Sequence, residues 1–309
     1  MVYTLGESLL DIILENLDKV TAKPGGSMLN ATISLCRAGI PVSLITELGD
    51  DETGNLIMDF LQNNHVSTEL VTRYKDSKTV LAIAILDKNK KPTYTFLKSY
   101  PKRRRLAPLP NFIRSDTLLF GSLYSLDPDL HPVLKTYVEA AKNAGALVIY
   151  DPNIRHPETL KNPILKKALM ENLQWADIIK GSNEDYEAIF GNQEPEEQLK
   201  SVHNINQKAY VIMTAGKSGS LALYDNRFTR VKARETEVVS TIGAGDGFNA
   251  GIIAFLAKAG KNAREMIKAE SLFRENLIKT GTDFASDVCS SEENYISISF
   301  GKNWKNEEL

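Results

Sequence analysis

The residues with the clearest chemical potential lie in a glycine-rich turn that leads directly into an apolar helical pattern. In VVSTIGAGDGFNAGIIAFLAKAG (residues 238–260), Gly243, Ala244 and Gly245 form the turn, and Asp246 follows it. The first N–H groups of a helix have no partner within the helix, and the helix dipole places roughly half a positive charge there. Glycine also lets the backbone approach a ligand closely. The segment therefore predicts an anion-binding site.

Asp246 adds a carboxylate to this anion site. A carboxylate repels a resting phosphate, but it is useful where it faces a substrate hydroxyl and accepts its proton. The N–H groups of Gly243, Ala244 and Gly245 would then stabilise the charge that develops on a transferred phosphoryl group. The pattern predicts phosphoryl transfer to a hydroxyl, with Asp246 as the base. The alternative is that Asp246 is only the N-cap of the helix.

The elements that must position this turn alternate between short apolar runs and longer segments with helical periodicity. We expect strands at 2–5, 42–48, 117–120, 146–150, 176–179 and 210–214, and helices at 27–38, 52–64, 128–144, 159–173 and 183–190. A hairpin is expected from 220–224 and 228–232, followed by a mostly helical stretch from Gly245 to about residue 290. Such alternation predicts an α/β fold in which helices cover both faces of a mainly parallel sheet.

Two further β-rich runs, 79–86 and 93–97, interrupt the alternation and are joined by the polar turn DKNKKP. They read as a hairpin, which forms either a lid over the site or an antiparallel edge pair on the main sheet. We expect one domain over residues 1–309, with a small β lid contributed by approximately 11–23 and 79–102. An exposed strand edge seeks a partner, so the lid also predicts a homodimer in which two lids pair.

The bulk composition is that of an ordinary globular chain. Of 309 residues, 42% are hydrophobic and 25% charged, and the net charge of −2 argues against nucleic acid or an anionic membrane as a partner. No apolar run approaches the roughly 20 residues of a membrane span. Glu7 and Asp11 interrupt the apolar N-terminal stretch, which does not read as a signal peptide. Cys36 and Cys289 are far apart, so we expect no disulfide framework and a cytoplasmic location.

Two of these segments resemble the signatures of the ribokinase-like (PfkB) carbohydrate kinases. Residues 238–260 are similar to the second signature, DTxGAGDxF, and GGSMLNATISLCRAG (residues 25–39) resembles the first, GGxxxNxA. GESLLD (6–11) and YDPNIR (150–155) look like segments of fructokinases, and the resemblance covers nearly the whole chain in the family's order. It implies a three-layer α/β/α fold and an ATP-dependent sugar kinase that is closest to fructokinases.

The resemblance assigns roles to individual positions. Asp246 would be the base, and the anion hole would be formed by Gly243, Ala244 and Gly245. The sugar would be held by Asp11, Gly25, Gly26, Asn30, Asn153 and Arg155. The nucleotide would be bound by Ser182, Thr214, Gly216, Gly219 and Asn294, and Mg²⁺ by Asp185 and Asp151. Asn30 could otherwise be a solvated helix residue, and residues 151–153 a plain turn. Ser27 is expected to cap the helix that carries Asn30.

Three positions depart from the family pattern. Ser240 replaces an aspartate that helps to bind an activating monovalent cation, which leaves activation by K⁺ in question. The family's N-x-x-E motif falls on residues 182–185, where Ser182 replaces the asparagine and Asp185 the glutamate. Met28 and Leu29 are bulky where the first signature has smaller residues, which would narrow the sugar pocket.

The acceptor sugar is the least determined part of the prediction. D-fructose, phosphorylated at O6, is the first choice, and 2-keto-3-deoxygluconate or another small sugar is the alternative. The basic run Lys102–Arg105 could meet an anionic substrate, or it could be a solvated loop near an acidic neighbour. A third hypothesis is a catalytically weak regulator that binds sugar or nucleotide without turnover.

Overall fold

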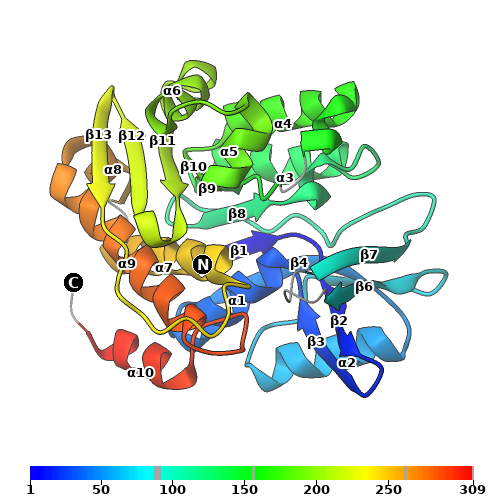
Figure 1. The fold of residues 1–309 in the computed structure, drawn as a ribbon. Helices are drawn as coiled ribbons and strands as arrows, with labels where there is room; N and C mark the ends of the chain where they lie inside the picture. The colour runs from blue at the N-terminus through cyan, green and yellow to red at the C-terminus, as the bar shows by residue number, and fades with distance from the viewer. Residues whose placement is uncertain (87–91, 155–156, 261–262, 308–309) are drawn as a thin grey trace.

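The computed structural model describes residues 1–86, 92–154, 157–260 and 263–307, and its fold is drawn in Figure 1. In these residues one large sheet has nine strands in the order β13-β12-β11-β10-β9-β8-β1-β4-β5. The strands are β1 (Val2–Leu5), β4 (Val42–Gly49), β5 (Val71–Tyr74), β8 (Thr117–Gly121), β9 (Leu147–Asp151), β10 (Ile178–Ser182), β11 (Tyr210–Thr214), β12 (Ser220–Tyr224) and β13 (Arg227–Val231). The pairs from β5 to β11 are parallel, and β12 and β13 join antiparallel as the predicted hairpin.

Helices cover both faces of this sheet (Figure 1). They are α1 (Ser27–Arg37), α2 (Glu52–Asn63), α3 (His131–Asn143), α4 (Pro163–Trp175), α5 (Asn183–Phe190), α6 (Pro195–Ile205), α7 (Ala244–Ala259), α8 (Ala263–Ala269), α9 (Ser271–Cys289) and α10 (Ile298–Asn306). In the described part of the chain, none of them combines the length and apolarity that would let it cross a membrane.

The two faces of the sheet belong to separate apolar cores, as the period-two alternation of strand side chains requires. In β8, Leu118 and Phe120 pack with α3 and α4 residues, whereas Leu119 faces the core formed with α1, α7 and α9. Val148 and Ile149 of β9 divide in the same way. The predicted three-layer α/β/α arrangement is therefore confirmed.

The residues expected to form the lid make a second, separate sheet. Its four strands, in the order β3-β2-β6-β7, are β2 (Leu9–Asn16), β3 (Lys19–Gly25), β6 (Lys78–Leu86) and β7 (Pro92–Ser99). We call it the small sheet; it lies beside β4 and α2 (Figure 1). The alternative of an edge pair on the main sheet is wrong, because β6 pairs with β2 rather than with a strand of the main sheet. Closure of the small sheet over a substrate stays a prediction.

Several elements differ from the sequence-based expectation. Strand β5 and helices α6 and α10 were not predicted, and α3 and α4 begin later than expected, after short 3₁₀ turns η1 (Leu123–Leu126) and η2 (Pro157–Lys161). The expected cap at Ser27 is also wrong. Gly26 is the N-cap of α1, with φ of 117°, and Ser27 is the first helical residue. Cys36 and Cys289 are free thiols, as predicted.

Candidate active site

The glycine-rich turn does start a helix, and its geometry differs from that of an ordinary capped helix. Gly243 is the N-cap of α7 in the left-handed conformation, with φ of 82°, and it has no side-chain cap among the described residues. A Cβ on Gly243 would lie 2.2 Å from the carbonyl oxygen of Asn294, so only glycine fits there. Asp246 is the third helical residue and not the N-cap. In the described residues the first turn of α7 thus has no side-chain cap beside its carboxylate, and its Ala244 amide donates to the Thr241 carbonyl oxygen at 3.3 Å.

Asp246 meets Asn30, which the sequence placed in the sugar-binding set. The Asn30 side-chain amide donates a hydrogen bond of 2.9 Å to Oδ2 of Asp246, across the contact between α1 and α7. Asn30 is buried, so the alternative of a solvated helix residue is wrong, and its Oδ1 atom has no hydrogen-bond partner within the described residues. Asp246 is 9% exposed. The structure thus brings together the predicted base and one predicted sugar ligand.

The small sheet contributes Asp11 and the glycine pair next to α1. The Asp11 carboxylate packs against Gly25, where an added Cβ would lie 2.0 Å from Oδ2. A Cβ on Gly26 would meet the carbonyl oxygen of Glu7 at 2.2 Å. Gly26 is therefore required where the backbone before β2 approaches the start of α1, and a side chain at position 25 would displace the Asp11 carboxylate. Asp11, Gly25 and Gly26 lie together, as the resemblance implied.

Two further predicted residues follow the end of β9. Asn153, with φ of 45°, donates a 2.6 Å hydrogen bond from its side chain to Oγ of Ser27, at the first turn of α1. Asp151, the last residue of β9, is 2% exposed and accepts hydrogen bonds from Lys180 and Asn249. Arg155, predicted to hold the sugar, lies outside the described residues.

Lys180 and Asn249 are residues that the sequence reasoning missed. Lys180 lies on β10 and Asn249 on α7, and both are buried around Asp151. Burial lowers the pKa of Lys180, but the carboxylates of Asp151, Asp185 and Asp246 raise it by more, so the pKa lies above its ordinary value. The available signal was the lysine inside an otherwise apolar strand, ADIIKGS.

The residues in place of the N-x-x-E motif form a capping box. The Ser182 hydroxyl accepts from the Asp185 amide, and the Asp185 carboxylate accepts from the Ser182 amide and hydroxyl. Burial and the neighbouring Asp151 raise the pKa of Asp185. In the described residues no group of three or more carboxylate, histidine or cysteine side chains could hold a metal ion. A Mg²⁺ ion at Asp151 and Asp185 would need phosphate oxygens or water as further ligands.

The predicted nucleotide residues near β11 fall into two groups. Thr214 ends β11, and Gly216, with φ of 50°, opens the 3₁₀ turn η3 (Gly216–Ser218) at the surface. Gly219 instead packs on the backbone of β13, where a Cβ would lie 2.2 Å from the Val231 carbonyl oxygen. A nucleotide contact at Thr214 and Gly216 stays a prediction, whereas the need for glycine at 219 is explained by packing.

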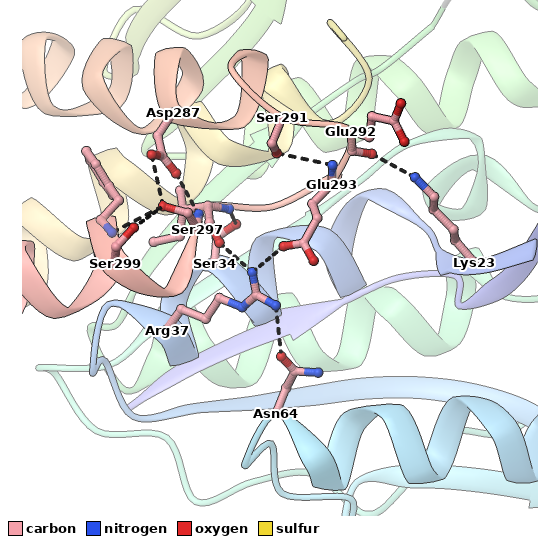
Figure 2. Close-up of polar contacts among 12 residues, drawn as sticks. Lys23, Ser34, Arg37, Asn64, Asp287, Ser291, Glu292, Glu293, Ser297 and Ser299 are labelled. Carbon is pink, nitrogen blue, oxygen red and sulfur yellow. Dashed lines mark hydrogen bonds and ion pairs between the residues drawn. The ribbon is translucent and has the colours of Figure 1, made fainter. Parts of the chain in front are cut away.

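The segment after α9 packs against the turn that starts α7. Figure 2 shows Arg37 of α1 bonded to Glu293 and Asn64, and Lys23 of β3 donating to the carbonyl oxygen of Glu292 at 2.7 Å. Asp287 anchors the same segment through Ser297. The backbone of Asn294 lies against Gly243. This loop therefore connects the small sheet, α1 and the open end of α7.

The basic run 102–105 does not act as one unit. Arg104 is buried, stacks 3.8 Å above the ring centre of Tyr100, and pairs with Glu47 and with Asp127. The other three basic residues of the run are exposed. Arg104 therefore connects the residue after β7 to the main sheet. Its acidic neighbours Glu47 and Asp127 already neutralise its charge, which agrees with the second alternative for Arg104 but not with its being solvated.

Comparison with known proteins agrees with this arrangement. The profile of the pfkB family carbohydrate kinases matches residues 3–271. A fructokinase of Salmonella typhimurium is 29% identical over 262 residues, covering 84% of this chain and 85% of its own length. A Vibrio cholerae O395 fructokinase structure, in fructose, ADP and calcium ion bound form, has a TM-score of 0.84 at 20% identity and 99% and 98% coverage.

A second solved structure shows that the same fold serves other acceptors. Aminoimidazole riboside kinase from Salmonella enterica, complexed with aminoimidazole riboside and an ATP analog, has a TM-score of 0.81 at 18% identity, with 99% of both chains covered. At such identity the likeness establishes the fold alone. Because the family profile spans most of the sequence, the chain belongs to the pfkB family carbohydrate kinases and is an ATP-dependent sugar kinase.

Proposed function

We propose that this kinase phosphorylates D-fructose at O6, with Asp246 as the base. The observation that carries the proposal is the 2.9 Å hydrogen bond between Asn30 and Asp246 at the uncapped start of α7. It puts a predicted sugar ligand and a carboxylate beside a helix start that has no side-chain cap in the described residues. Fructokinases from several organisms among the relatives, at 23–29% identity, support fructose as the acceptor.

In the proposed reaction the sugar lies between the small sheet and α1, held by Asp11, Asn30 and Asn153. Asp246 accepts the proton of the sugar hydroxyl. The hydroxyl oxygen forms a bond to the γ-phosphorus as the bond from that phosphorus to the bridging oxygen of ADP breaks. Amides of the first turn of α7 stabilise the transferred group, so that positioning and electrostatics supply most of the rate.

Mg²⁺ fits the buried acceptors near Asp151. Oδ1 of Asp151 and Oδ1 of Asn249 have no hydrogen-bond partner in the described part of the chain. Asp151, with Asp185 nearby, would hold the ion through water, and the ion would neutralise charge on the ATP phosphates. Thr214, Gly216 and Asn294 remain the proposed nucleotide contacts. Ser182 lies opposite Thr214 on the neighbouring strand β10. Ser240 offers a hydroxyl that already accepts from the Ile242 amide, so we include no monovalent cation.

The proposal is tested by replacing the carboxylate without changing its shape. We expect Asp246→Asn to keep the melting temperature and ATP binding, because the amide still accepts from Asn30, and to lower kcat by roughly 10²–10⁴-fold. ADP release should be measured with fructose, ribose, 2-keto-3-deoxygluconate and nucleosides as acceptors. Asp283→Asn, at an exposed ion pair on α9, serves as the matched control. Near-normal turnover of Asp246→Asn would refute the assignment.

The 2-keto-3-deoxygluconate alternative loses part of its support. It relied on a basic run that could meet a carboxylate, and Arg104 of that run is neutralised by Glu47 and Asp127. A regulator without turnover would show melting shifts with sugar or ATP but no ADP release in the same assay.

Two further proposals concern the oligomeric state of the protein and its location in the cell. A homodimer through the small sheet remains our proposal, supported by large apolar side chains exposed on its strands and turns: Leu17, Val20, Ile85, Phe96 and Leu97. Contact with a second copy would remove part of this apolar surface from water. The cytoplasm remains the proposed location, supported by the two free thiols.

A further inference from the structure

Lys180 is a buried ammonium group that the mechanism above does not use. It is 3% exposed, and its Nζ atom lies 3.0 Å from Oδ2 of Asp151. Asn249 donates to the same oxygen at 2.5 Å. A Cβ built on Gly245 would lie only 2.9 Å from Nζ of Lys180. The ammonium group therefore lies directly against the first turn of α7.

Two features of this position oppose a buried ammonium group, and nearby carboxylates offset them. Burying a charge is costly, and the start of a helix carries a positive partial charge that repels an ammonium group. A buried ion pair is seldom more stable than well-packed apolar side chains of the same volume. The carboxylates of Asp151, Asp185 and Asp246 compensate the charge of Lys180. The protein therefore maintains a positive charge directly beside a helix start that already favours anions.

The hydrogen-bond capacity around Lys180 is also incompletely used. An ammonium group has three N–H donors, and in the described residues Asp151 is its one hydrogen-bond acceptor. Oδ1 of Asp151 and Oδ1 of Asn249 are buried without a partner there, although these residues are 2% and 0% exposed. Buried polar atoms are normally paired, so this cluster is built to meet a polar ligand.

We propose that Lys180 is a positioning residue of the phosphoryl-transfer site, where Asp151 and Asn249 hold its charge beneath Gly245. From there the ammonium group increases the positive potential at the amides of Gly243, Ala244 and Gly245, which receive the transferred phosphoryl group. A Cβ at position 245 would lie 2.9 Å from Nζ of Lys180, so a larger residue there would make the ammonium group shift. This inference rests on the proposed kinase function, because it assigns a further residue to the same site.

The test removes the charge in two ways. Lys180→Met removes both charge and donor, whereas Lys180→Gln keeps a donor for Asp151 and protects the fold. We expect kcat to fall by about 10²-fold in both, with KM for ATP and sugar changed less than about threefold. Lys258→Met is the matched control: this lysine of α7 donates to the carbonyl oxygens of Trp304 and Glu307, away from Gly245, and its loss should leave kcat unchanged.

A second measurement does not depend on turnover. ADP with magnesium and aluminium fluoride mimics the transferred phosphoryl group, and it should raise the melting temperature of the wild type beyond the shift given by ADP alone. Both Lys180 variants should keep the ADP shift and lose the additional one. The inference is overturned if either variant keeps wild-type kcat or the full additional shift. Absence of turnover in the wild type with every acceptor would instead overturn the proposed function, and the aluminium fluoride comparison would still decide the role of Lys180.

Discussion

Helices α5 and α7 both begin at the same end of the main sheet, yet their first turns are built in opposite ways. At α5, Ser182 and Asp185 satisfy each other in a complete capping box. At α7, Gly243 takes a left-handed conformation and supplies no side-chain cap. Helix α1 begins like α7, with Gly26 at φ of 117° and no side-chain cap. The two uncapped helices carry the hydrogen-bonded pair Asn30 and Asp246.

The difference separates helix starts that stabilise the fold from those that are left open for a ligand. A helix has four N–H groups at its start without partners, and a side-chain cap uses them. A glycine without a side-chain acceptor leaves them for an anion. This explains why the predicted metal residue Asp185 and nucleotide residue Ser182 have local structural roles, whereas the glycine-rich turn does not.

Among changes to these helix starts, the largest effect should come from Gly243→Ala at the start of α7. Gly243→Ala forces a non-glycine residue into φ of 82° and places its methyl 2.2 Å from the Asn294 carbonyl oxygen. We expect kcat to fall by roughly 10²–10³-fold, because the amides move, and the free energy of unfolding to fall by about 1–3 kcal/mol.

Gly260→Ala is the matched control for Gly243→Ala at the other end of the same helix. Gly260 also has a positive φ, of 69°, but no described atom lies within 4 Å of an added Cβ. It should lose about 1 kcal/mol of stability and keep its kcat. Equal kcat values in the two variants, measured by steady-state kinetics below the melting transition, would contradict the role of the open turn.

Breaking the capped start of α5 should have a smaller effect, and of a different kind. Ser182→Ala removes the acceptor for the Asp185 amide, so we expect the free energy of unfolding to fall by about 1 kcal/mol in urea titrations. The KM for ATP should change less than about threefold, since the hydroxyl is already used within the box. A larger rise in KM would show that the hydroxyl also contacts the nucleotide.

The smallest effect concerns Asp51, the side-chain cap of α2. Burial raises the pKa of Asp51, but hydrogen bonds from Thr79 and Gly54 lower it by more, so the pKa lies below its ordinary value. Because the folded pKa lies below the unfolded one, the stabilisation is present above the unfolded pKa and is lost as pH falls through the folded pKa. Asp51→Asn should therefore cost about 0.3–1 kcal/mol near neutral pH, and the difference from wild type should shrink in acid. A difference that grows as pH falls would contradict this sign.

Local sequence patterns predicted most of the main sheet and its helices. Apolar strands such as 117–120 alternate between two cores, and the change from strand to helix periodicity marks each crossover. The elements that were missed are β5, which has 4 residues, and α6 and α10, which have 11 and 9 residues and are amphipathic but polar on average. For these, packing against the rest of the chain outweighs local preference.

The sequence by itself determined that a glycine-rich turn leads into helix α7, because the local pattern changes there to helical periodicity. Tertiary structure alone decided which side chains meet there. Asn30 and Asp246 are 216 positions apart, and Lys180 reaches Asp151 and Gly245 only because β10 lies between β9 and β11 below α7. Such contacts depend on how distant elements pack, and no local periodicity encodes that packing.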